Sequence, residues 1–179
     1  MLAGNPHRFN LGRLGFLLLK TDGSKAVMDD LKNTRQEVDM WNGIIYSYFT
    51  LEEHPVTVKT ACHPTSDAIG ISVKSDLVKK GQIKVFLDFP YPDSKYFSQY
   101  IGDNNLPNAH SSTIKAKNAY SATIARKVDD SEYFVSLNWT TKAQLSYGDT
   151  VYVRAILTVI GLIQSMPSLF GNNPIPFIS

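Results

Sequence analysis

The sequence lacks the features that mark several common classes of protein. It has a single cysteine, Cys62, so it cannot form an intrachain disulfide and is not a disulfide-stapled scaffold. Its basic residues are spread out, and no cluster is denser than Lys79-Lys80, so the electrostatic footprint of a nucleic-acid-binding protein is missing. The apolar run from Val151 to Ile163 contains Arg154 and is too short to span a bilayer as a helix. These absences predict neither a nucleic-acid nor a membrane partner.

Motifs for common metal and cofactor chemistry are missing as well. Gly12-Arg13-Leu14-Gly15 has the wrong spacing for a phosphate-binding loop. Cys62 and His63 are neighbours on an expected strand and therefore face opposite ways, which disfavours a Cys–His catalytic pair. The histidines do not have metal-ligand spacing; they are His7, His54, His63 and His110. We therefore predict no metal and no cofactor, and we interpret Cys62 as a small core residue beside Val56 and Val58.

Paired carboxylates are the remaining catalytic candidates. Glu37 and Asp39 lie on one face of an extended segment, about 7 Å apart, which would suit a glycosidase pair. Two acids on the solvent face of a strand are much more common. Asp129-Asp130 and Glu52-Glu53 fall in turns, where acidic residues serve local hydrogen bonding and solvation. The sequence therefore predicts no catalytic residues.

What the chain does contain is a succession of alternating strands. Its 179 residues are 43% hydrophobic and 19% charged, which is typical of one globular domain. Within Trp41 to Pro90, apolar residues alternate with polar ones, as in Ile69, Ile71 and Val73, because successive strand side chains point to opposite faces. Ile83 to Phe89 repeats this pattern. No helical pattern of ten residues separates the strands, so we expect antiparallel sheets.

Turn signals divide the chain into about ten strands. Asn42-Gly43 is the strongest hairpin signal. An all-β, antiparallel two-sheet sandwich is favoured over a closed barrel. Alternation stops after Ile160, so we predict a sandwich domain over residues 1–160 and an irregular tail over residues 161–179. The first ten residues contain no apolar run and are not a secretion signal, which leaves the localisation open.

Aromatic residues near loops are the better lead to a binding site. Flat rings stack on sugar faces and on partner surfaces. The candidates are Trp41, Tyr91, Tyr96, Phe97 and Tyr100. The other interpretation is that Trp41 fills one end of the sandwich and the loop tyrosines cover the sheet. For Trp41 the core assignment is favoured, because Val38 and Met40 are close by in the same segment.

Several segments resemble one family in their order and spacing. They are Asn5–Phe16, Arg35–Ile45, Thr60–Ala68, Phe86–Pro92 and Ala125–Tyr133. Together they resemble the N-terminal β-sandwich region of bacterial six-hairpin glycosidase-like proteins, which include many glycoside hydrolases. The similarity covers Asn5 to Trp139, and no single motif in it is diagnostic.

The resemblance implies a sandwich of the galactose-mutarotase-like, supersandwich type packed against an (α/α)6 barrel. In such proteins the barrel holds the acid and the base that cleave the glycosidic bond. No helical repeat follows Ile160, so no catalytic residue is carried over. The chain also opens after the family's first strands and departs from the pattern after about Leu157, so we expect an incomplete sandwich.

Two functions from different classes follow as expectations. One is an accessory sandwich domain of a carbohydrate-active enzyme, whose partner is the helical catalytic barrel of the parent protein. The other is a free-standing carbohydrate- or protein-binding module that uses the loop from Tyr91 to His110, with a saccharide or a protein as its ligand.

Overall fold

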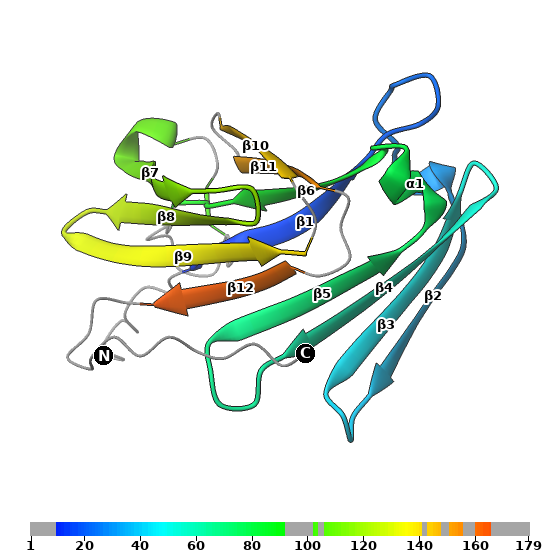
Figure 1. The fold of residues 1–179 in the computed structure, drawn as a ribbon, viewed down its shortest axis with the longest axis horizontal. Helices are drawn as coiled ribbons and strands as arrows, with labels where there is room; N and C mark the ends of the chain where they lie inside the picture. Colours follow the sequence, from blue (N-terminus) through cyan, green and yellow to red (C-terminus); the bar gives the residue numbers. More distant parts are fainter. Residues whose placement is uncertain are drawn as a thin grey trace, which may run out of the picture.

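The computed structural model describes residues 10–91, 102–103, 106–140, 143–147, 151–155 and 160–165. These residues form two open antiparallel sheets, which confirms the all-β sandwich (Figure 1). The described strands are β1 (Arg13–Leu18), β2 (Leu31–Asp39), β3 (Ile44–Leu51), β4 (His54–Cys62), β5 (Ala68–Lys74), β6 (Ile83–Asp88), β7 (His110–Lys117), β8 (Ser121–Val128), β9 (Ser131–Trp139), β10 (Ala143–Tyr147), β11 (Val151–Ala155) and β12 (Ile160–Ser165).

Short helical turns connect some of these strands. The 3₁₀ turn η1 (Met28–Asp30) precedes β2, and η2 (Pro107–Ala109) precedes β7. The single α-helix of the described residues, α1 (Asp76–Lys79), begins after Ser75, whose hydroxyl oxygen accepts a hydrogen bond from the Leu77 amide. No helix among the described residues is long and apolar enough to cross a membrane.

The two sheets differ in size. The smaller sheet has the strand order β1-β6-β11-β10, and the larger has the order β2-β3-β4-β5-β12-β9-β8-β7. In the larger sheet β2 and β7 are therefore the two edges (Figure 1). The pairing within each sheet is antiparallel, as the strand spacing predicted.

Two clusters of buried side chains join the sheets face to face. In one cluster, Val85 and Leu87 of β6 pack with Ile124 of β8 and Val135 of β9. In the other, Ile83 of β6 packs with residues of β3, β4 and β5, such as Leu51. The alternation of β6 predicted this arrangement, because each of its inward residues is about 1% exposed.

β12 extends the larger sheet past residue 160, where the sequence indicated that alternation stops. Ile160 lies opposite Ile71 of β5 and Trp139 of β9, and Gly161 lies opposite Gly70 and Asn138. β12 is therefore an interior strand of the larger sheet, between β5 and β9. The run from Ile160 to Ile163 carries no period-two signal, so alternation did not reveal this strand.

Candidate functional site

The hairpin of β2 and β3 carries the two most exposed large apolar side chains of the described residues, Trp41 at 99% and Met40 at 87%, both in the turn. Val38 of β2 is 60% exposed and Ile45 of β3 is 38% exposed. We call these four residues the hairpin-tip surface. The prediction that Trp41 fills the core is therefore wrong. Trp41 lies in the turn itself. This β2–β3 turn lies at the end of the two strands that points away from α1 and from the smaller sheet (Figure 1).

The register explains why this end of the sheet is uncovered. Val38 faces Ile45, and Ile45 faces Thr60, so the three share a face with the buried Val58 one step further along β4. Val58 and Ile71, which lies opposite Thr60, are buried in the cluster that contains Ile83 of β6, so only the end of this row that belongs to β2 and β3 is exposed. Cys62 lies beyond this row and is exposed. The interpretation of Cys62 as a core residue is therefore wrong.

Asp39 holds the hairpin turn in place. Its Oδ1 accepts hydrogen bonds from the Trp41 and Asn42 amides at 3.1 Å each, and its Oδ2 accepts one from Asn42 Nδ2 at 2.7 Å. The bond from Asn42, followed by the bonds from the backbone amides, lowers the pKa of Asp39. A general acid needs the opposite shift. Glu37 forms an ion pair with Arg35 at 3.0 Å, so both acids have structural partners in the hairpin.

Tyr91 belongs to a separate cluster at the opposite side of the larger sheet. Its hydroxyl donates a hydrogen bond to Asp129 Oδ1 at 2.9 Å, and its ring stacks on His110 with centroids 6.0 Å apart. The bond to Asp129 raises the pKa of the Tyr91 hydroxyl. Since His110 lies on edge strand β7 and Trp41 lies beside edge strand β2, seven strand spacings of about 4.8 Å separate them. The structure therefore does not bring Trp41 and Tyr91 together.

Arg126 is the buried centre of this second cluster. It is 1% exposed, and its Nη1 donates to Ser112 Oγ at 2.5 Å while its Nη2 lies 2.7 Å from His110 Nδ1. Its guanidinium carbon lies 4.5 Å from the centre of the Phe89 ring, and its Nε has no hydrogen-bond partner within the described part of the chain. Burial, followed by the charge of Arg126, lowers the pKa of His110, although Asp88 acts in the other direction. This cluster ties the end of β6 to β7 and β8.

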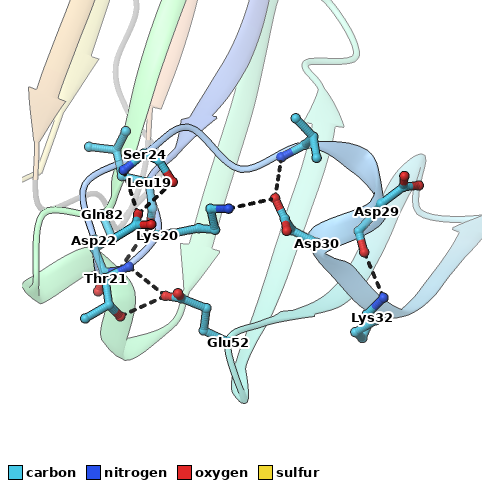
Figure 2. A network of polar contacts seen from close by, with 11 residues as sticks. Leu19, Lys20, Thr21, Asp22, Ser24, Asp29, Asp30, Lys32, Glu52 and Gln82 are labelled. Atoms are coloured by element: carbon cyan, nitrogen blue, oxygen red, sulfur yellow. Dashed lines mark hydrogen bonds and ion pairs between the residues drawn. The ribbon is translucent and has the colours of Figure 1, made fainter.

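A polar cavity lies at the other end of β3, beside the β3–β4 turn. Its volume is about 290 Å³, and its lining consists of charged and polar residues: Lys20, Asp29, Asp30, Lys32, Asn33, Thr50, Glu52 and Glu53. Glu52 Oε2 accepts bonds from both the amide and the hydroxyl of Thr21 at 2.8 Å (Figure 2). Asp30 accepts from the Val27 amide at 2.8 Å and lies 3.6 Å from Lys20 Nζ. Two of the four carboxylates therefore already bind groups of the protein.

Two tyrosines on the outer face of β3 were not singled out from the sequence. Tyr46 and Tyr48 have ring planes inclined by 6° and centroids 6.4 Å apart. Lys59 Nζ lies 5.3 Å from the centre of the Tyr46 ring, and Arg35 lies 4.7 Å from that of Tyr48. The signal was available, because residues two apart on a strand share a face. The sequence alone does not show that this face of β3 points outward, because the strand is largely apolar.

The other predicted site residues have mixed outcomes. Tyr96, Phe97 and Tyr100 lie outside the described residues, as does most of the loop from Tyr91 to His110. Among the described residues, no group of three His, Cys, Asp or Glu side chains is placed to hold a metal ion. His63 Nδ1 accepts a hydrogen bond from the Thr65 amide at 3.3 Å and so stabilises the turn in which it lies.

No family model matches the chain, and no curated protein matches it.

Proposed function

We propose that this chain is a non-catalytic β-sandwich domain of a carbohydrate-active enzyme, which supports the (α/α)6 barrel of a parent glycoside hydrolase. The observation that carries the proposal is the hairpin-tip surface. Three large apolar residues in sequence proximity, Val38, Met40 and Trp41, are each at least 60% exposed. Contiguous exposed apolar residues mark interaction sites on soluble proteins.

The composition of this surface suits protein docking. Tryptophan is enriched among the residues that dominate binding energy, and methionine is enriched at interfaces. Asp39 fixes the turn through three hydrogen bonds, so little conformational freedom would be lost when Trp41 is buried. The resemblance to six-hairpin glycosidase-like proteins supplies the identity of the partner. The bonds of Glu37 and Asp39 within the hairpin agree with a domain that leaves the chemistry to the barrel.

The test begins with the coding sequence that follows Ser179. The proposal expects several hundred further residues with a pattern of paired helices. The corresponding helical region is then titrated with the 179-residue chain in a calorimeter. Trp41→Ala should weaken binding about 30-fold or more, which is the effect of removing a hot-spot residue worth about 2 kcal/mol.

Tyr120→Ala is the matched control. Tyr120 is 48% exposed in the turn between β7 and β8, at the opposite edge of the larger sheet. Its removal should leave the affinity unchanged. Equal affinities of the wild type and Trp41→Ala would overturn the proposal, and so would the lack of any helical region.

A free-standing carbohydrate-binding module is the second candidate. The parallel rings of Tyr46 and Tyr48, with basic groups beside them, favour it, because sugars bind to aromatic faces lined by hydrogen-bond donors. Titration with soluble oligosaccharides tests it. Saturable binding that is lost in Tyr48→Ala and kept in Trp41→Ala would favour the module over the accessory domain.

A further inference from the structure

Among the described residues, no strand lies along the outer side of β2. β2 is the outermost strand of the larger sheet, and it spans nine residues. Its one strand partner among the described residues is β3. An edge of this length presents unpaired amide and carbonyl groups that another strand can bind.

The charges of β2 are divided along its length. Lys32 and Arg35 lie toward its start, and Glu37 and Asp39 lie toward its end. Arg35 and Glu37 are neighbours on the outer face, with side chains 63% and 49% exposed. Scattered charges normally discourage pairing at an edge. A strand with a positive first half and a negative second half, however, is complementary to an antiparallel copy of itself.

Symmetry limits how two copies can pair. If a twofold axis runs perpendicular to the sheet, it lies midway between the two copies of one residue, which face each other. Residues equally far before and after that residue then also face each other. An axis at Arg35 places two arginines opposite each other, and an axis at Glu37 does the same for two glutamates. An axis at Val38 places Glu37 opposite the partner's Asp39. Like charges that face each other across strands are destabilising.

An axis at Gln36 gives the opposite result. Arg35 then faces the partner's Glu37, and Glu37 faces the partner's Arg35, so both pairs are attractive. Thr34 faces the partner's Val38, and neither of these side chains is charged. Of the positions from Arg35 to Val38, only Gln36 pairs all the facing charges favourably.

We infer that β2 binds β2 of a second copy of this chain, antiparallel and with Gln36 on the twofold axis. The two larger sheets then form one continuous sheet. A bulge between Lys32 and Arg35, where Asn33 has a φ of +51°, interrupts the regular edge. The bulge confines pairing to the segment that follows it, which is the segment with complementary charges.

The opposite edge lacks this property. Strand β7 carries Lys115 and Lys117 and no acidic residue. Two copies of β7 therefore cannot form an attractive charge pair in any register. The inference also does not depend on the proposed function, since it rests on the backbone edge of β2 and on the charges of Arg35 and Glu37, and Val38 is the one residue of the hairpin-tip surface in the paired segment.

Sedimentation equilibrium of the 179-residue chain at low ionic strength tests the inference. The wild type should show a monomer–dimer equilibrium. Arg35→Glu and Glu37→Arg should each weaken the dimer about tenfold or more, because two attractive pairs become two repulsive pairs. Raising the salt concentration to about 1 M should weaken the wild-type dimer, since the Debye length falls to about 3 Å.

Two further samples identify the facing residues. The double variant Arg35→Glu/Glu37→Arg should regain the wild-type affinity. An equimolar mixture of the two single variants should form a heterodimer, because one copy then has acidic side chains at both positions and the other copy has basic side chains at both. This mixture also shows that each single variant is folded. Lys115→Glu, on the other edge, should leave the equilibrium unchanged.

Three results would overturn the inference. The wild type could remain monomeric at every concentration. The dimer could persist unchanged in both single variants, which would place the interface elsewhere. Finally, the single variants could be monomeric without any recovery in the double variant or in the mixture, which would show that Arg35 and Glu37 do not face each other.

Discussion

The chain has two tryptophans, and the structure places them in opposite environments. Trp41 is 99% exposed, whereas Trp139 is 5% exposed and its indole Nε1 donates to the Ala119 carbonyl at 2.7 Å. We expect Trp41→Ala to change the free energy of unfolding by less than about 0.5 kcal/mol, as surface substitutions do. Trp139→Ala should cost about 3–5 kcal/mol, because it leaves a large cavity in the core and removes a hydrogen bond.

Urea unfolding followed by circular dichroism measures both changes, because that signal does not depend on the tryptophans. The wild type and both variants should have the same denaturant slope, so that the midpoints report stability. In thermal unfolding, the loss in Trp139→Ala corresponds to about 6–20 °C for a chain of this size. A loss above about 2 kcal/mol in Trp41→Ala would refute the exposed turn, and a loss below about 1 kcal/mol in Trp139→Ala would refute the packing of β9.

Two further predictions concern pH and the backbone. The pKa of His110 is lowered from 6.5 by burial and by Arg126, so the unfolded chain binds the extra proton at mildly acidic pH. The contribution of His110 to the free energy of unfolding should therefore be fully present above the unfolded pKa and be lost as the pH falls through the folded pKa. Across this range the urea midpoint should fall less in His110→Gln than in the wild type. An equal fall in both proteins would contradict the lowered pKa of His110. Glu53 has a φ of +66°, which costs a residue other than glycine about 1–2 kcal/mol. Glu53→Gly should therefore raise the free energy of unfolding by about 1 kcal/mol in the same assay, and a loss would show that the Glu53 side chain has a stabilising role.

The period-two pattern of the sequence predicted most of the sheet structure. The segments around Ile71 and Val85 alternate because one face of each strand is buried against the other sheet. Asn42-Gly43 marked the first hairpin correctly, since Gly43 has a φ of +64°. Each of these signals is local, so a single sequence contains it.

The environment of a residue at the end of a strand is not a local property. Trp41 and Cys62 follow apolar neighbours, and the sequence assigned both to the core. Whether they are covered depends on contacts with the other sheet, such as those that β6 makes in the two core clusters, and these contacts join residues far apart in the sequence. The inward position of Arg126 was missed for a related reason, because its partners Ser112 and Phe89 are distant in sequence.

The emission of Trp41 on addition of the parent protein's helical barrel tests the account most directly. In Trp139→Phe, Trp41 is the single tryptophan of the chain. Its emission should be that of a solvated indole in the free chain. On binding it should shift to shorter wavelength and resist quenching by acrylamide, because the docked barrel covers the hairpin-tip surface. Binding that leaves the emission and the quenching of Trp41 unchanged would contradict the account.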